Sequence, residues 1–304
     1  MSAMDSPFRI AIVGGTGVGE ALADQLDTKG RCSERPETPF GLPSDEIQLG
    51  SIEGTPVALL RRHGAQHQFN PTHVPYRANI FALKLLGCTH VLASGATGSL
   101  QEAIKPRDLV LCDQLIDRTT ARDQQRTFFD GAAVHVEFAD PCCAVMRQWL
   151  MQAAESCDDL ILHPQGTYVC MEGPAFSTRA ESRMHRSWGG DLIGMTALPE
   201  ARLVREAEMA YALVGMPTDY DAWREHDPGE DTATVLTEVL AHLAHASDAC
   251  LKLIRAALRD VTVLRDTPSE AGSALANAIW TSPDAIDHET RQKLAPLWSQ
   301  RLGV

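Results

Sequence analysis

The chain has 304 residues, of which 44% are apolar and 22% charged, a balance typical of a globular protein and unlike that of a disordered one. Its 27 Lys and Arg against 40 Asp and Glu give a net charge of −13, which argues against non-specific binding to nucleic acid or anionic membranes. No apolar run approaches the ~20 residues of a membrane span, no signal peptide is visible, and the eight cysteines form no C-x-x-C pair, so we expect a cytoplasmic protein.

Short apolar segments alternate with helix-like segments, which predicts an α/β fold with a central mixed β-sheet flanked by helices. We expect strands at residues 8–13, 56–60, 90–93, 108–116, 160–172, 192–196 and 211–216. Helices are expected at 76–86, 232–258 and 288–302, and loops at 24–45, 118–131 and 224–231. Composition does not shift enough to mark a second domain. We therefore expect a single domain over residues 1–260 and a helical tail, 261–304, packed on or near it.

A glycine-rich run, Gly14-Gly15-Thr16-Gly17, follows the first expected strand. Its backbone N–H groups and the Thr16 hydroxyl could converge on an anion. The dinucleotide-binding fingerprint is not met, because Glu20 stands where its third glycine belongs, and the P-loop signature is also missing. A tight strand-to-loop turn explains the run equally well.

A cation and an imidazole, Arg62 and His63, end the strand expected at 56–60. Arginine can hold a phosphate with two donors, and histidine can add another, so this pair is a candidate oxyanion site. A basic surface patch is the alternative. We do not expect a metal at His63, His67 and His73, because the HExxH glutamate and a third ligand are missing.

Three further segments follow expected strands. A turn of small residues is expected at 94–99. Residues 172–181 offer Phe176, which could stack on a base, and Ser177. Met195 and Thr196 end the strand at 192–196 and precede a helix start.

Two carboxylates, Asp219 and Asp221, follow the strand at 211–216 with a spacing of two, which aims both to one side of an extended chain. Two acceptors this close repel each other, and one of them tends to keep its proton. Such a pair suits a ligand that offers an N–H donor beside an atom needing a proton, as the 6-amino group and N7 of adenine do. The alternative is a group of helix N-cap residues.

In this order and spacing the motifs G-G-T-G, R-H-G, V-L-A-S-G-A-T-G-S-L, D-Q-L-I-D-R-T, E-G-P-A-F-S-T-R-A-E-S, M-T-A-L-P-E and T-D-Y-D-A-W resemble one known family. They are similar to the 5′-methylthioadenosine phosphorylase group of the trimeric purine nucleoside phosphorylases, over roughly residues 8–258. The resemblance implies a homotrimer that cleaves a nucleoside with inorganic phosphate as co-substrate and needs no metal or organic cofactor.

The resemblance also assigns site residues. Phosphate would be held by Thr16, Arg62, His63, the backbone around Ala96, and Thr196; the ribose would pack on Met195; the base would meet Phe176, Ser177, Asp219 and Asp221; and the 5′ substituent would lie near Thr232, Val235 and Leu236, with His135 reaching in from a neighbouring subunit. Gly95 departs from the family, in which a Thr hydroxyl commonly stands there, so we expect weaker phosphate contact.

By this likeness, Asp219 would protonate N7 while phosphate attacks C1′, releasing adenine and 5-methylthioribose 1-phosphate. Three alternatives stay open: a phosphorylase of another purine such as methylthioinosine, a nucleosidase that uses water, and a non-catalytic nucleoside-binding protein. A nucleotide-dependent oxidoreductase would need the missing third glycine.

Overall fold

The computed structural model describes residues 8–15, 17–27, 30–224 and 232–302. Within these residues eleven strands form one sheet: β1 Ile10–Gly14, β2 Cys32–Glu34, β3 Ile47–Ile52, β4 Thr55–Arg61, β5 His90–Ser99, β6 Leu109–Cys112, β7 Gln114–Arg118, β8 Leu162–His163, β9 Thr167–Met171, β10 Leu192–Gly194 and β11 Ala210–Tyr220. Parallel and antiparallel pairs both occur, so the sheet is mixed.

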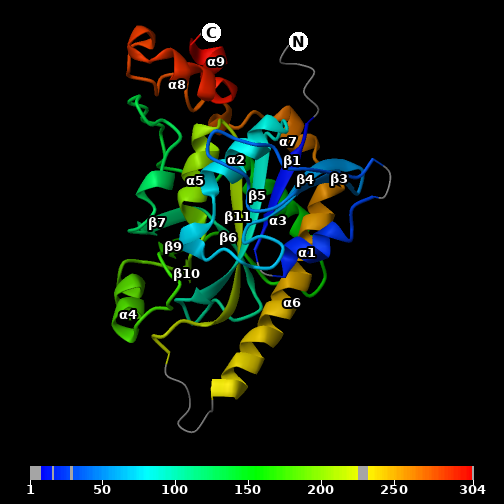
Figure 1. The fold of residues 1–304 in the computed structure, drawn as a ribbon. Helices are drawn as coiled ribbons and strands as arrows, with labels where there is room; N and C mark the ends of the chain where they lie inside the picture. The colour runs from blue at the N-terminus through cyan, green and yellow to red at the C-terminus, as the bar shows by residue number, and fades with distance from the viewer. Residues whose placement is uncertain (1–7, 16, 28–29, 225–231, 303–304) are drawn as a thin grey trace.

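Helices cover both faces of this sheet (Figure 1). They are α1 Val18–Ala23, α2 Tyr76–Leu85, α3 Ala144–Ala154, α4 Arg179–Ser187, α5 Ala197–Glu206, α6 Thr232–Leu258, α7 Thr262–Asp266, α8 His288–Lys293 and α9 Ala295–Leu302. The predicted α/β fold with a central mixed sheet is therefore confirmed.

Two hydrophobic cores lie on opposite faces of the sheet, because successive side chains of a strand point to opposite sides. In β1, Ala11 and Val13 face a core shared with α2, α5 and the C-terminal tail, whereas Ile10 and Ile12 face a core shared with α1, α3, α6 and α7. In the tail, Trp298 of α9 is fully buried and stacks on Phe129 at 5.2 Å between ring centroids. The boundary proposed at residue 260 stays a prediction.

The sheet divides at β5, and this division positions the site. Along its whole length β5 pairs in parallel with β11; its first four residues also pair with β1, and its last two pair antiparallel with β10. Strand β1 therefore leaves β5 at Ala93, and β10 joins β5 only at Gly98. An open space at the carboxyl ends of parallel strands, where neighbours diverge, is the usual position of a ligand site in such sheets.

Several expected elements differ from the structure. The segment 94–99, expected as a turn, continues β5, and the single strands expected at 108–116 and 160–172 are each divided in two. Strand β2 lies inside the loop expected at 24–45, and β3 and α3 were not expected. The helix expected at 288–302 is interrupted at Leu294. By contrast, α6 has the bounds that its apolar spacing predicts.

Candidate active site

A cleft of about 340 Å³ opens at the carboxyl ends of β1, β4, β5, β10 and β11. Its volume lies in the range of ~300–1,000 Å³ that small-molecule sites occupy. Among the residues that line it are Gly15, Arg62, His63, His67, Phe69, Pro71, Gly95, Ala96, Thr97, Gly98, Phe176, Met195, Thr196, Thr218, Asp219, Asp221, Val239 and Leu243. The cleft thus contains eight of the fourteen residues that the sequence nominated.

The guanidinium of Arg62 is buried at one end of the cleft and is already engaged. Its Nε and Nη2 donate to the carboxylate of Glu200 at 2.7 and 3.0 Å, and Nη1 donates to the Ser94 carbonyl at 3.0 Å. Burial lowers the pKa of Arg62, but the adjoining Glu200 outweighs burial and leaves it raised, so the cation is permanent. The pair of donors expected to bind phosphate therefore binds Glu200 instead, and Nη1 lies beside the lining residue Gly15.

The imidazole of His63 has a defined tautomer. Its Nδ1 lies 2.8 Å from the carbonyl oxygen of Phe69, and since a carbonyl only accepts, Nδ1 carries the proton. Burial, with Arg62 adding to it, lowers the pKa of His63 to about 4, so the ring is neutral at pH 7. Its Nε2 is then an acceptor, not the donor expected from the sequence. A neutral His63 therefore suits the P–OH of hydrogen phosphate.

Hydroxyl and backbone groups complete this end of the cleft. Thr196 is almost buried, and its Oγ1 lies 3.6 Å from the position that a Cβ on Gly95 would occupy. Ala96 lines the same wall. Thr16, also predicted to bind phosphate, lies outside the described residues. This end of the cleft, here called the anion end, therefore brings together four of the predicted residues, which lie in or just after β4, β5 and β10: Arg62, His63, Ala96 and Thr196.

Two carboxylates, Asp219 in β11 and Asp221 just after that strand, line the opposite end. An irregularity in the pairing of β11 with β5 falls between Pro217 and Asp219. Asp219 Oδ1 accepts from the Thr218 hydroxyl at 2.9 Å. Asp221 is 8% exposed, and its Oδ2 has no hydrogen-bond partner among the described residues. A buried carboxylate oxygen left without a donor is costly, which indicates that a ligand supplies the donor.

The base wall is only partly as expected. Phe176 and Met195 line the cleft, and Phe176 is 86% exposed at its mouth. Ser177 does not line it, and its hydroxyl instead lies 3.7 Å from the Met171 sulfur.

The apolar wall comes from α6, but one turn further along than expected. Val239 and Leu243 line the cleft, whereas Val235 and Leu236 do not, and Leu236 is 57% exposed. Val235, Val239 and Leu243 follow the i, i+4, i+8 spacing of one helix face, so the apolar pattern itself could have identified the two lining residues. The side chain of Thr232 is not described.

His135 lies away from the cleft of its own chain. It is exposed, contacts Trp280 edge-on at 4.7 Å between ring centroids, and lines a separate hollow of about 270 Å³ with Glu137 and Arg205. Its own chain therefore does not bring it to the site.

The described residues contain no group of three or more His, Cys, Asp or Glu side chains arranged to hold a metal ion. Within the same residues no helix has the length and apolar character needed to cross a membrane.

Comparisons with known proteins agree with this geometry. Residues 9–259 match the phosphorylase superfamily. The chain is 46% identical to S-methyl-5′-thioadenosine phosphorylase of Thermosynechococcus vestitus, covering 97% of this chain and 99% of that protein, and 45% identical to the Neurospora crassa enzyme of that name, covering 84% and 81%.

Solved structures give the same result. A methylthioadenosine phosphorylase from an antarctic soil metagenomic library is 41% identical and superposes with a TM-score of 0.86 over 97% of this chain and all of that one. An adenosine/methylthioadenosine phosphorylase of Schistosoma mansoni, a double mutant in complex with adenine, is 31% identical with a TM-score of 0.78 over 90% and 100%. The chain therefore belongs to the phosphorylase superfamily, in the group of S-methyl-5′-thioadenosine phosphorylases.

Proposed function

We propose that this protein cleaves 5′-methylthioadenosine with inorganic phosphate, giving adenine and 5-methylthioribose 1-phosphate. The observation that carries the proposal is the polarity of the cleft. One end presents Arg62 and Thr196, and the other presents the unpartnered Oδ2 of Asp221 beside Asp219. An anion and a base with an exocyclic amino group satisfy these two ends.

In the proposed reaction, phosphate bound beside Arg62, His63 and Thr196 attacks C1′ as the bond to the purine breaks. The dianion stabilises the cationic sugar while it acts as nucleophile. A protonated Asp219 donates to N7, and Asp221 accepts from the 6-amino group. Since phosphate is the nucleophile and the base leaves neutral, the reaction requires no metal or organic cofactor.

The chemistry of the apolar wall supports a methylthio group at C5′. Val239 and Leu243 offer only hydrocarbon there. An apolar pocket rejects an added hydroxyl by only ~10²-fold, so we expect adenosine to be a poor but measurable substrate.

We also propose a cytoplasmic homotrimer in which His135 completes the 5′ end of a neighbour's cleft. The support is the exposure of His135 together with its distance from its own cleft, and the family likeness of its segment. Analytical ultracentrifugation tests the assembly, and a fully active monomer would contradict it.

The decisive assay for the reaction measures adenine release from methylthioadenosine with and without phosphate. Release should depend strictly on phosphate, and equal release in its absence would identify a nucleosidase. Comparing kcat/KM for methylthioadenosine and methylthioinosine then tests the purine preference, and equal values would contradict the assignment of Asp221.

A further inference from the structure

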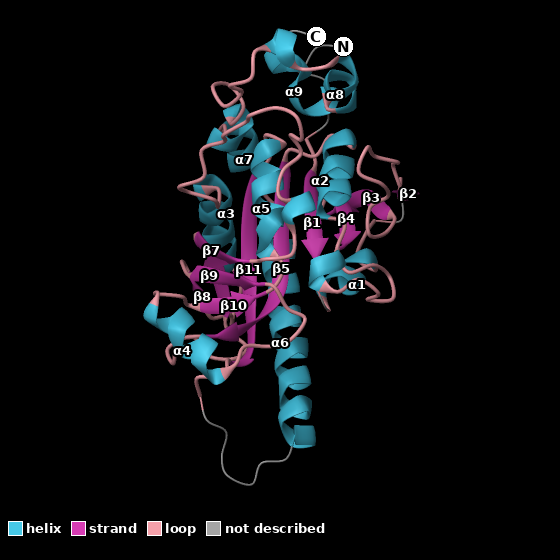
Figure 2. Cartoon of the chain, turned by 60° about the vertical axis from the view of Figure 1, so that its left-hand side comes forward, coloured by secondary structure: helices cyan, strands magenta, loops and turns pink. Residues whose placement is uncertain are grey.

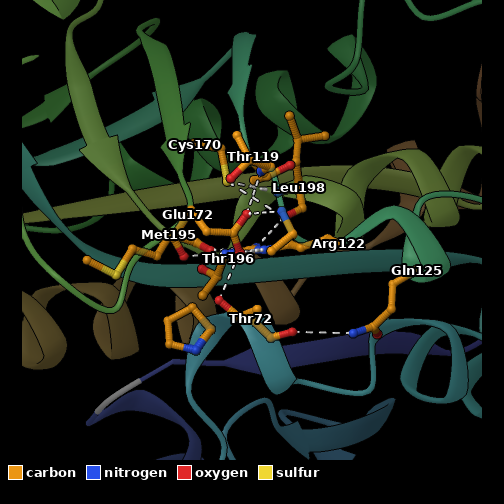
Figure 3. A network of polar contacts seen from close by, with 12 residues as sticks. Thr72, Thr119, Arg122, Gln125, Cys170, Glu172, Met195, Thr196 and Leu198 are labelled. Atoms are coloured by element: carbon orange, nitrogen blue, oxygen red, sulfur yellow. Dashed lines mark hydrogen bonds and ion pairs between the residues drawn. The ribbon is translucent and has the colours of Figure 1, made fainter.

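Arg122 is a buried arginine that does not line the cleft but binds backbone segments that form part of the cleft wall. The side chain of Arg122 has no exposed surface, and all of its nitrogens donate hydrogen bonds (Figure 3). Nη1 donates to the carbonyls of Met195 and Leu198 at 2.8 and 2.7 Å and to the Tyr76 hydroxyl at 3.2 Å. Nη2 donates to the Glu172 carbonyl at 2.7 Å, and Nε donates to the Glu172 carboxylate at 2.9 Å.

The carboxylate of Glu172 is in turn fully engaged (Figure 3). Its Oε1 also accepts from the Thr72 hydroxyl at 2.8 Å, and its Oε2 accepts from the backbone N–H groups of Thr120 and Ala121 at 2.5 and 2.8 Å. Partial burial raises the pKa of Glu172, but the hydrogen bonds from Ala121 and Arg122 outweigh it and lower the pKa to about 2. The group is therefore an anion at any pH at which the protein is expected to work.

These bonds join segments that are far apart in the sequence but border the same cleft. Thr72 belongs to the 3-10 helix Pro71–His73, whose Pro71 lines the cleft, and Glu172 follows the lining residue Met171. The carbonyls of Met195 and Leu198 flank Thr196, which lies at the anion end.

The segment around Thr196 depends on side chains for its position. It connects β10 to α5, and Leu198 has extended dihedral angles (φ −123°, ψ 139°) inside the first turn of that helix. Arg122 donates to the carbonyls of Met195 and Leu198, and the Leu198 carbonyl also accepts from Cys170 Sγ at 3.7 Å. Loss of Arg122 would therefore remove a charged donor from both carbonyls. Small displacements of this segment would move the Thr196 hydroxyl relative to phosphate.

We propose that Arg122, held by Glu172, is a positioning residue for phosphate and acts through Thr196. The proposal rests on the proposed phosphorolysis. Arg122 itself does not line the cleft, so it cannot act by touching the substrate.

The test is a double-mutant cycle with Arg122→Lys and Thr196→Ala, read out as KM for phosphate and kcat at saturating methylthioadenosine. Lysine keeps the charge but has three donors in place of a planar fork that serves five bonds. We expect Arg122→Lys to raise KM for phosphate by ~10- to 100-fold, as misplacement of a binding group does. In the Thr196→Ala background the same change should have less than about a threefold effect, because residues that act as a unit are not additive.

Trp149→Phe is the matched control for loss of stability alone. Trp149 is buried in the opposite core, and its Nε1 donates to the carbonyls of Ala257 and Asp260 at 2.9 and 2.8 Å. This variant should lower the melting temperature and leave KM for phosphate of the folded protein unchanged.

Two results would overturn the proposal. One is an Arg122→Lys variant whose KM for phosphate equals that of the wild type while only its melting temperature falls. The other is an effect on KM that is equally large with and without Thr196. If Arg122→Lys does not fold, Glu172→Gln takes its place, because it keeps the shape but sets an amide against the N–H donors of Thr120 and Ala121. A wild-type protein without phosphate-dependent release would instead contradict the proposed function itself.

Discussion

Replacing Asp221 by asparagine should stabilise the ligand-free protein while impairing its activity. Asp221 is 8% exposed, and its Oδ2 has no hydrogen-bond partner among the described residues. A buried group left unsatisfied costs about 1–3 kcal/mol, more when it is charged. Asparagine has nearly the same shape and carries no charge. We therefore expect the free energy of unfolding to rise by about 1 kcal/mol, which corresponds to about 2 °C in Tm for a chain of this size.

The same substitution removes the acceptor proposed for the 6-amino group of the base. A hydrogen bond to a charged group contributes about 1.5–3 kcal/mol, so kcat/KM for methylthioadenosine should fall by about 10- to 100-fold. An amide can also present its N–H₂ group to a 6-oxo base. The preference for methylthioadenosine over methylthioinosine should therefore fall further than the activity itself.

Differential scanning calorimetry of the ligand-free protein and steady-state kinetics with both nucleosides measure these effects. The reasoning would be refuted if Asp221→Asn lowered Tm and left kcat/KM and the base preference unchanged. Such a result would assign Asp221 a purely structural role.

Three other predictions concern different parts of the molecule. Gly95→Thr should lower KM for phosphate by about tenfold, because a Cβ at this position would meet only Thr196 Oγ1 among the described residues, at 3.6 Å, and the substitution adds a hydroxyl at the anion end; a higher KM would contradict this. Burial raises the pKa of Glu206 to about 7, above its usual 4.5, so the folded protein holds this proton more tightly than the unfolded chain does. The resulting contribution to the free energy of unfolding is fully present below pH 4.5 and is lost as pH rises through 7. In urea unfolding, the free energy of unfolding of Glu206→Gln relative to that of the wild type should therefore increase between pH 5 and 8.5, by up to about 3 kcal/mol. Parallel plots of the two free energies against pH would contradict this. His135→Ala should raise KM for methylthioadenosine and leave KM for phosphate unchanged, and equal effects on both would exclude a role at the 5′ end.

The end of β5 shows where sequence reasoning about the fold fails. Glycines weaken strands, so the run of small residues after Ala93 predicts a turn. In the structure that run lies between β11 and β10, and its pairing with them outweighs local preference. Glycine suits position 98 because a Cβ there would lie only 3.2 Å from Asp221 Cβ, closer than an ordinary van der Waals contact. The close approach involves residues 123 positions apart, 98 and 221, which no local pattern reveals.

The site shows a similar division. The carboxylates of Asp219 and Asp221 could be recognised because their spacing and the preceding apolar run are local features. The partner of Arg62 could not be recognised from the sequence. Glu200 is 138 positions away from it and reaches it only because α5 packs on the sheet. The tautomer of His63 could not be predicted for the same reason, since the Phe69 carbonyl that fixes it is positioned by the geometry of the loop.

Helix α6 is one uninterrupted helix that runs from the core it shares with α1, α3 and α7 to the cleft. Its C-terminal half is buried at Cys250 and Leu253, Val239 and Leu243 line the cleft, and its N-terminal end projects beyond the sheet (Figure 2). From Cys250 to the first turn the helix extends about 27 Å, so a tilt of about 2° at the core moves that end by about 1 Å. A small change in packing at one end of the helix is thus amplified at its other end. Substitutions at Cys250 or Leu253 that tilt the helix would therefore displace the apolar wall of the cleft. Nucleoside selectivity can thus change through substitutions at positions that do not contact the substrate.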